Sequence, residues 1–296
     1  MLNIVVTGGN GFLLGNYIKD YNHNFIAPRS TEVNWVTGKG INTLPDEPDV
    51  FIHSAAIYGG LPFNQNNPKR VLLDNTKMSV NVFEYIFRAK PKKVIMIGSC
   101  CAYPNRDEKF TEDMLGEGRP QSTVELYAMS KLWHLAACER LVDDWTCLVL
   151  ANMYGLGEIY KHEESSHVIG SITKKIMKAK EDNTDVQLLG TGTPTRPLVY
   201  VKDVCDVIDF FATTHYTPNG AYNVGEEEGM TIKEMAETIA DVLQFKGKIL
   251  WGDPKDNGSL HRAMSYDKLN KIHPYRIRTK LREGLNESIS FISSPR

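Results

Sequence analysis

The sequence predicts a doubly wound α/β fold, in which helices cover both faces of a parallel sheet and a smaller α/β lobe is interleaved with it. Three observations indicate this fold. Short apolar runs alternate with stretches of helical period, and the first run leads into a glycine-rich turn. After Asn152 polar and turn-rich segments replace this regular alternation. Strands that are apolar throughout are typical of a parallel sheet buried on both faces.

The elements of the sheet are expected in the first 150 residues. Strands are predicted at residues 3–7, 50–53, 94–97 and 146–150, with a further strand ending near Ile26. Residues 74–90 and 124–143 place apolar side chains three or four positions apart. This spacing indicates two helices that cover the sheet.

After Asn152 polar and turn-rich segments interrupt the pattern. We expect, in order, a polar loop at 160–166, a helix at 168–180, a turn cluster at 190–197, and a return to the sheet at 201–213 and 221–224. Residues 231–243 are predicted to form a helix, because Thr231 and Glu234 fit a capping box.

The predicted domains are therefore interleaved. Residues 1–152 with about 195–224 are expected to form the larger domain, and about 153–194 with 225–296 the smaller lobe. Interrupted polar segments often carry substrate contacts, so the smaller lobe is expected to bind the substrate.

Composition excludes several classes of function. With 34 basic and 36 acidic residues the formal net charge is −2, which disfavours a nucleic-acid partner. The sequence shows no signal peptide and no apolar run of about 20 residues, so we expect no membrane segment and a cytoplasmic location.

Five cysteines without CxxC spacing predict neither a disulfide framework nor a zinc site. Cys138, Cys147 and Cys205 are expected to be buried thiols. No His/Asp/Glu cluster has ligand spacing, so no metal is expected.

The first strand continues into Gly8-Gly9-Asn10-Gly11 and an amphipathic stretch that ends near Asp20. This is the strand, glycine turn and helix of a Rossmann site, where backbone N–H groups at a helix N-terminus bind a pyrophosphate. Leu14 stands where a third glycine is usual, and Gly15 follows it. Helix and strand are therefore expected to lie slightly farther apart.

The end of the second strand indicates which dinucleotide is bound. Arg29 and Ser30 stand where NAD-binding proteins carry an acidic residue for the ribose hydroxyls. We expect Arg29 to pair with a 2′-phosphate, with no carboxylate nearby, so NADP(H) is the predicted cofactor. A solvated surface arginine is the alternative.

A catalytic group is predicted from three residues. Ser99 follows the strand at 94–97, and Tyr127 and Lys131 lie one helical turn apart on the next helix. Tyr127 is expected to exchange a proton with a substrate oxygen, and the Lys131 ammonium and a cationic nicotinamide are expected to favour its phenolate. Ser99 is expected to hydrogen-bond the reacting oxygen.

Nine segments follow one another in an order that resembles a known family. They are TGGNG, HSAA, GSCCAYP, YAMSK, ANMYG, SSHVI, GTGTPTR, VKDV and YNVG. From residue 2 to about residue 290 the chain resembles extended short-chain dehydrogenases/reductases that act on nucleotide sugars. The combination of GSCCAYP, SSHVI and GTGTPTR is similar to the GDP-L-fucose synthase family.

The resemblance implies an NADPH-dependent enzyme that epimerises GDP-4-keto-6-deoxymannose at C3 and C5 and then reduces C4. The epimerising residues would be Cys101 and His167, because a 4-keto group acidifies the neighbouring protons enough for one acid and one base. The implied cofactor contacts are Gly8, Gly9, Asn10, Gly11, Phe12, Leu13, Arg29, Ala55, Ala56, Ile97, Gly98, Tyr127, Lys131, Asn152, Met153 and His167.

The implied substrate contacts are Asn152, Lys175, Leu189, Arg196 and Asn257. Arg196 matches a family arginine that can meet the diphosphate. Lys175, Leu189 and Asn257 stand where the family tends to have Arg, Trp and Asp, which weakens the case for this sugar and base. The resemblance also implies a homodimer formed through the helices at 74–90 and 124–143.

Two alternatives stay open. The chain could be a C4-reductase or 4-epimerase on another nucleotide sugar, such as a GDP-heptose or GDP-colitose intermediate. It could also be a non-catalytic regulator that binds NADP, although the intact Ser99, Tyr127 and Lys131 disfavour this.

Overall fold

The computed structural model describes residues 1–157, 168–214, 216–257, 259–273 and 278–293. Its centre is a six-stranded sheet in which every strand pair is parallel, in the order β11-β6-β4-β3-β1-β2. The strands are β1 (Asn3–Thr7), β2 (Asn24–Ile26), β3 (Val50–His53), β4 (Lys93–Ser99), β6 (Trp145–Leu150) and β11 (Gly220–Val224). The predicted doubly wound α/β fold is therefore confirmed.

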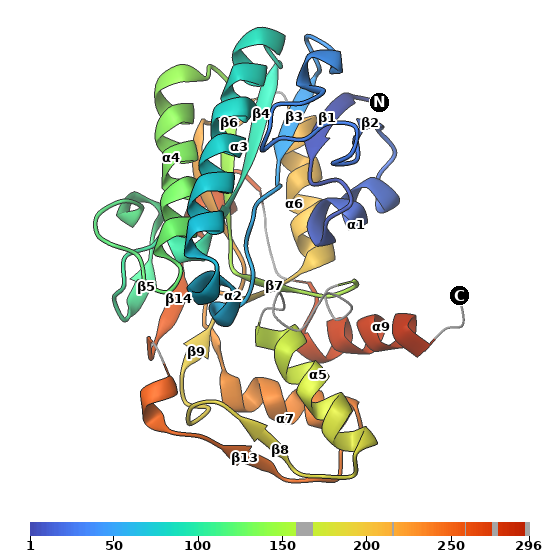
Figure 1. Cartoon of the computed structure of the whole chain (residues 1–296), viewed down its shortest axis with the longest axis vertical. Coiled ribbons are helices and arrows are strands. Elements are labelled where there is room, and N and C mark those ends of the chain that lie inside the picture. The colour runs from blue at the N-terminus through green and yellow to red at the C-terminus, as the bar shows by residue number, and fades with distance from the viewer. Residues whose placement is uncertain (158–167, 215, 258, 274–277, 294–296) are drawn as a thin grey trace.

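Helices cover both faces of the sheet (Figure 1). On one face α3 (Pro68–Ala89) lies against α4 (Glu125–Leu141), and on the other α1 (Phe12–Asp20) lies against α6 (Val201–Thr213). Strand order reverses at β1, whose neighbours are β2 on one side and β3 on the other. In open parallel sheets, ligands bind at the carboxyl ends of the strands at such a switch point.

Below the sheet in Figure 1 lies a smaller group of helices and paired strands. It contains α5 (Val168–Glu181), α7 (Ile232–Val242), α9 (Leu281–Ser293), and β8 (Val186–Leu188) paired with β13 (Ile249–Trp251). The expected domain boundaries stay a prediction.

The described residues also form three further strand pairs and several short helices. The pairs are β7 (Asn152–Tyr154) with β10 (Leu198–Tyr200), β9 (Thr195–Arg196) with β12 (Met230–Thr231), and β5 (Glu108–Phe110) with β14 (Arg262–Met264). The short helices are α2 (Leu61–Asn66), α8 (Asp267–Asn270), and the 3₁₀ turns η1 (Ile41–Thr43), η2 (Cys100–Ala102), η3 (Glu112–Met114) and η5 (Pro254–Asp256).

Most predicted elements are confirmed, and one is wrong. The strands at 3–7 and 50–53 have the predicted bounds, and the helix at 168–180 is α5. The Thr231–Glu234 capping box is present at the start of α7. Residues 201–213, expected to return to the sheet, form α6 instead. Their buried side chains recur every three or four positions, and thirteen residues are long for a strand.

None of the helices in the described part of the chain is both long enough and apolar enough to cross a membrane.

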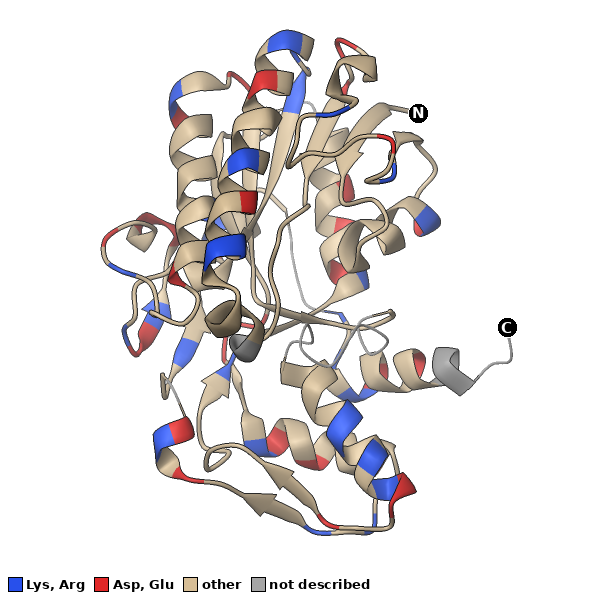
Figure 2. Ribbon diagram, viewed as in Figure 1, with Lys and Arg blue, Asp and Glu red and all other residues tan. Residues whose placement is uncertain are grey.

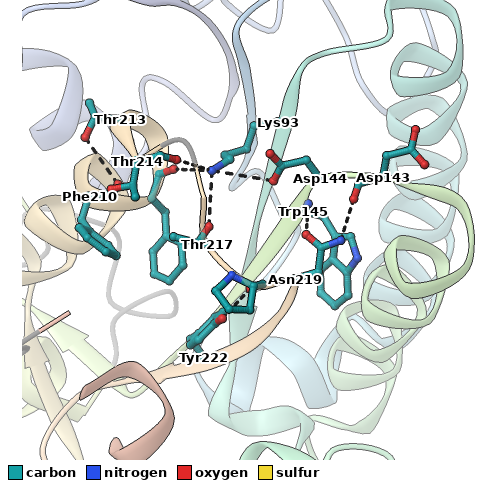
Figure 3. A network of polar contacts seen from close by, with 12 residues as sticks. Lys93, Asp143, Asp144, Trp145, Phe210, Thr213, Thr214, Thr217, Asn219 and Tyr222 are labelled. Atoms are coloured by element: carbon teal, nitrogen blue, oxygen red, sulfur yellow. Dashed lines mark hydrogen bonds and ion pairs between the residues drawn. The ribbon is translucent and has the colours of Figure 1, made fainter. Parts of the chain in front are cut away.

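Lys93 holds the amino-terminal edge of the sheet together (Figure 3). Its side chain is buried, and its Nζ donates to the carbonyl oxygens of Phe211, at 3.2 Å, and Thr214, at 2.8 Å. The Asp144 carboxylate lies 3.8 Å from the same nitrogen. Lys93 therefore links the starts of β4 and β6 to the carbonyls at the end of α6, where a cation is favoured by the helix dipole.

We predict that Lys93→Met lowers the free energy of unfolding by about 1–3 kcal/mol, because the buried carbonyls lose their donor. Urea denaturation measures the change. Lys92→Met is the matched control, since the neighbouring Lys92 side chain is exposed and pairs with Asp49 at the surface. Equal effects of the two substitutions would contradict the role of Lys93.

Candidate functional site

The glycine turn after β1 leads directly into the N-terminus of α1. The Gly11 N–H donates to the Gly8 carbonyl at 2.8 Å, and Gly8 has a φ of 78°, which favours glycine. A Cβ on Gly8 would lie 3.0 Å from the backbone nitrogen of Ala55. Among the described residues no side-chain hydrogen bond caps the start of α1, the kind of helix N-terminus that binds a pyrophosphate in a Rossmann site.

The Thr7 hydroxyl fixes the next loop against this turn. Its Oγ1 accepts hydrogen bonds from the backbone N–H groups of Ser54 and Ala55, at 3.1 and 3.0 Å. The His53 Nδ1 lies 2.8 Å from the same oxygen. The ends of β1 and β3 are thus held together, which places the predicted contacts Ala55 and Ala56 beside the glycine turn.

Most other predicted cofactor contacts lie on elements at this edge of the sheet. Asn10 is in the glycine turn, Phe12 and Leu13 begin α1, Ile97 and Gly98 precede Ser99 in β4, and Asn152 and Met153 are in β7. The Leu14 side chain is fully buried, where a glycine was usual. A Cβ on Gly15 would make only an ordinary contact, 3.5 Å from the Gly9 carbonyl oxygen.

The surroundings of Arg29 differ from expectation in one respect. Its side chain is exposed, as a 2′-phosphate contact requires. Its backbone N–H, however, donates to the Glu32 carboxylate at 2.8 Å. The expectation of no carboxylate nearby is therefore wrong: the chain turns after Pro28 and brings Glu32, three residues on, back to Arg29.

Ser99, Tyr127 and Lys131 come together, as predicted. The Ser99 side chain is near enough to the Tyr127 hydroxyl to lower its pKa, against the effect of burial, and the Ser99 Oγ accepts from the Cys101 N–H at 3.2 Å. The Lys131 Nζ lies 5.6 Å from the centroid of the Tyr127 ring. The Tyr58 ring covers that of Tyr127, with centroids 4.2 Å apart.

Burial sets the protonation of this group. It raises the pKa of Tyr127, and the charge of a Cys101 thiolate raises it further. Burial also lowers the pKa of Lys131 to about 8. In the protein alone loss of hydration favours the phenol form of Tyr127. The expectation that the Lys131 ammonium and a cationic nicotinamide together favour the phenolate stays a prediction. Tyr127 is a protonated phenol, the form that donates a proton.

Cys100 and Cys101 form a pair of thiols next to Ser99. The hydrogen bond from Cys100 is the main cause that lowers the pKa of Cys101, and those from Ser99 and Tyr58 lower it further. The same hydrogen bond raises the pKa of Cys100. Cys101 is therefore the thiol of the pair that ionises first, beside the hydroxyls of Ser99 and Tyr127.

The predicted substrate residues are not all placed as expected. The Arg196 Nη1 donates to the carbonyl oxygens of Thr195 and Ser259, at 2.7 and 2.9 Å. The Asn257 Oδ1 accepts from the Thr191 N–H at 2.7 Å, so this side chain holds the turn at Gly190. The Leu189 side chain is 69% exposed. Leu189 thus offers an exposed aliphatic surface without an aromatic ring, and the Asn257 carboxamide oxygen is already bonded to Thr191.

Lys175 is one of four lysines on α5. Figure 2 shows the lysines of this helix in blue on the smaller lobe. The Asn152 amide donates to the Pro197 carbonyl at 3.1 Å and so ties β7 to the strand after Arg196. His167 lies outside the described residues.

Three residues at or near the candidate site were not predicted from the sequence, namely Tyr58, His134 and Arg262. Tyr58 follows the HSAA segment and carried no motif signal. His134 is three residues after Lys131; its buried Nε2 lies 2.6 Å from the Ser79 Oγ, and its ring lies edge-on to that of His53, with centroids 4.9 Å apart. Arg262 lies in β14, far from the other motifs in sequence.

Comparisons with known proteins agree with this geometry. A family model described as the NAD dependent epimerase/dehydratase family matches residues 4–225. The GDP-L-colitose synthase of Yersinia pseudotuberculosis is 30% identical over 285 residues, with 92% of each chain covered. The GDP-L-fucose synthase of Sinorhizobium fredii is 30% identical over 258 residues, covering 85% of this chain and 81% of that protein.

Solved structures share the fold. A GDP-L-fucose synthetase from Naegleria fowleri superposes with a TM-score of 0.83 at 22% identity, covering 98% of this chain and 92% of that one. A GDP-6-OMe-4-keto-L-xylo-heptose reductase from C. jejuni gives a TM-score of 0.86 at 17% identity, covering 98% and 97%. With the glycine turn, the Ser99–Tyr127–Lys131 group and a family model that spans most of its length, the chain belongs to the NAD dependent epimerase/dehydratase family.

Proposed function

We propose that this protein converts GDP-4-keto-6-deoxy-D-mannose to GDP-L-fucose, by epimerisation at C3 and C5 followed by reduction of the C4 keto group with NADPH. The observation that carries the proposal is the Cys101 thiol, whose pKa is lowered beside Ser99 and Tyr127. A reductase that only transfers a hydride needs no such base.

Epimerisation is assigned to Cys101 and His167. A 4-keto group makes the protons at C3 and C5 acidic, so a thiolate can remove them and a second group can return a proton on the opposite face. Of the two neighbouring thiols Cys101 is the base, because the hydrogen bond between them keeps Cys100 protonated while Cys101 ionises.

Reduction is assigned to Ser99, Tyr127 and Lys131. The cofactor, when bound, supplies the hydride for C4. Ser99 and Tyr127 hydrogen-bond the C4 oxygen, and Tyr127, held as a phenol by burial, donates its proton to that oxygen. Lys131 holds the cofactor ribose and stabilises the Tyr127 oxygen once the proton has left.

A C4-reductase on another nucleotide sugar is the second candidate, such as a GDP-colitose or GDP-heptose intermediate. Two observations favour it: Leu189 offers no aromatic ring, and Asn257 is bonded to Thr191. The similarity to the Yersinia GDP-L-colitose synthase points the same way. Retention of a tightly bound oxidised cofactor through purification would instead favour a 4-epimerase.

We predict that NADPH is used with a kcat/KM about 10-fold or more above that of NADH, because Arg29 is exposed to pair with the 2′-phosphate. Steady-state kinetics with both cofactors measure this ratio. Arg29→Ala is expected to narrow it. Glu32→Gln is the control and should keep NADPH preferred. Equal kcat/KM for the two cofactors in the natural protein would refute the assignment.

The protein is further proposed to be a homodimer formed through α3 and α4. Both helices expose large apolar side chains, namely Leu72, Leu73, Val80, Phe87, Met129, Trp133 and Leu141. Light scattering is expected to give twice the chain mass of 33.4 kDa. Trp133→Glu should yield a monomer, whereas Tyr216→Glu, at an exposed site elsewhere, should not. A monomeric natural protein would exclude the dimer.

The two half-reactions are separated by incubating the protein with GDP-4-keto-6-deoxymannose and NADPH in deuterated water and examining the product by NMR. We predict deuterium at C3 and C5 of the natural product. Cys101→Ser should slow this incorporation by about 100-fold or more, because a hydroxyl is a far weaker base than a thiol. NADPH oxidation should continue.

Tyr127→Phe is the complementary variant. It should abolish most NADPH oxidation but leave exchange at C3 and C5 and cofactor affinity largely intact, because it removes the proton donor and keeps the ring. If the natural protein reduces the substrate without incorporating deuterium, the bifunctional assignment fails and the C4-reductase stands.

A further inference from the structure

The Tyr58 side chain lies between the two reactive groups of the site. Its ring covers that of Tyr127, with centroids 4.2 Å apart and an angle of 34° between the ring planes. Its hydroxyl shares a hydrogen bond with the Cys101 thiol. One side chain therefore contacts both the proposed proton donor of the reduction and the proposed base of the epimerisation.

Two buried asparagines hold the backbone on either side of Tyr58. The Asn75 Oδ1 accepts from the Ile57 N–H, and the Asn75 Nδ2 donates to the Ile57 carbonyl oxygen, both at 2.8 Å. On the other side, the Asn64 Nδ2 donates to the Gly59 carbonyl oxygen at 2.9 Å. Asn75 is 4% exposed and Asn64 6%. The segment between β3 and α2, which forms neither helix nor strand, is thus fixed at the point where it carries Tyr58.

The same hydrogen bonds continue to the helix that carries Tyr127. The Ser79 Oγ donates to the Asn75 carbonyl oxygen at 2.8 Å, and the His134 Nε2 lies 2.6 Å from the same Oγ. Because Ser79 has given its only hydrogen to the carbonyl, the His134 Nε2 is the donor to Ser79. His134 and Tyr127 are both on α4. The network therefore fixes α4 relative to the loop of Tyr58.

The Tyr58 hydroxyl favours the ionised form of the Cys101 thiol. Burial, the charge of Cys101 and the shared hydrogen bond all raise the pKa of Tyr58. The hydrogen bond from Cys100 is the main cause that lowers the pKa of Cys101 to about 6, and the bond from Tyr58 lowers it further. Tyr58 therefore remains a phenol where Cys101 is a thiolate, and a neutral hydroxyl that donates to an anion forms a strong hydrogen bond.

Other charged groups also face this thiol. The charge of Arg262 in β14 lowers the pKa of Cys101. Burial, followed by the charge of Arg262, lowers the pKa of Arg196, and the charge of Cys101 raises it. After burial, the same thiolate charge raises the pKa of Tyr127. Tyr58→Phe would leave all these groups in place and remove a single hydroxyl.

We propose that Tyr58 is a positioning residue for both half-reactions: its hydroxyl holds the Cys101 sulfur as the base, and its ring holds the Tyr127 phenol in the orientation that donates a proton. This inference rests on the proposed function. It assigns the hydroxyl to the epimerisation and the ring to the reduction, so the two roles can be separated by substitution.

Tyr58→Phe tests the hydroxyl, because it keeps the ring over Tyr127. Alkylation of Cys101 by iodoacetamide is followed against pH in the protein without substrate, and tandem mass spectrometry identifies the modified cysteine. We expect the midpoint of this profile to rise by about one pH unit, since the thiolate loses a donor. Below both midpoints, deuterium incorporation at C3 and C5 should fall by about 10-fold, and NADPH oxidation much less.

Tyr85→Phe is the matched control. The buried Tyr85 hydroxyl donates to the Pro45 carbonyl oxygen at 2.9 Å, in the segment before β3. This substitution also removes one hydroxyl from a buried tyrosine, and it should leave the alkylation profile of Cys101 unchanged.

Tyr58→Leu tests the ring. It should lower the kcat of NADPH oxidation by about 10-fold or more and change the KM little, because Tyr127 loses the contact that orients it. The measurement uses whichever 4-keto nucleotide sugar the natural protein reduces. Tyr58→Phe should restore most of this kcat. A role in packing alone would instead lower the urea midpoint of Tyr58→Leu and leave the kcat of the folded protein unchanged.

An unchanged alkylation midpoint in a folded Tyr58→Phe protein overturns the role of the hydroxyl, and an unchanged kcat in a folded Tyr58→Leu protein overturns that of the ring. Should Tyr58→Leu fail to fold, Tyr58→Met, which fills more of the space without a ring, is measured in its place. The alkylation needs no substrate. If the natural protein shows no exchange at C3 and C5, the epimerase assignment fails, while a raised midpoint in Tyr58→Phe still supports the contact with Cys101.

Discussion

The hydrogen bonds of the Thr7 hydroxyl are the interaction on which the site depends. They join the end of β1 to the first residues after β3. Ala55 is thereby held so close to Gly8 that a Cβ on Gly8 would lie 3.0 Å from the Ala55 backbone nitrogen. Because all six strands are parallel, the loops that follow them emerge at one edge. Fixing these two ends therefore fixes the cofactor turn relative to Ser99, which ends the neighbouring strand β4.

Burial then decides which proton each reactive side chain holds. Tyr127 and Lys131 lose hydration together, which keeps the phenol protonated and makes the ammonium easier to deprotonate. Burial acts on Cys101 as well, but hydrogen bonds from Cys100, Ser99 and Tyr58 outweigh it and lower the pKa of the thiol. One small region thus contains a proton donor and a thiol poised to act as a base. This division suits a reaction in which carbon-bound protons are removed before a carbonyl is reduced.

Local patterns predicted most elements correctly, and the errors have local causes. Residues 201–213 mix apolar side chains with Lys202, Asp203, Asp206 and Asp209, and their buried side chains recur at the three- and four-residue spacing of a helix rather than alternating as in a strand. The turn that brings Glu32 back to Arg29 is held by backbone hydrogen bonds to the Arg29 carbonyl and by the Glu32 side chain, and no periodicity marks it. The sequence shows that Asn257 stands where the similar family tends to have Asp. It does not show that the Asn257 side chain holds the turn at Gly190.

The sequence by itself determined the parallel sheet, the dinucleotide turn and the Ser99–Tyr127–Lys131 group, because strand period, glycine spacing and one helical turn are properties of short segments. Only the tertiary structure decided that Tyr58 covers Tyr127 and that Arg262 lies beside Arg196. It also decided that the Cys101 thiol ionises before the Cys100 thiol. Arg196 and Arg262 are 66 positions apart, and Tyr58 and Tyr127 are 69 positions apart. Such contacts depend on how the strands are ordered and how much water is excluded between them, which no local pattern records.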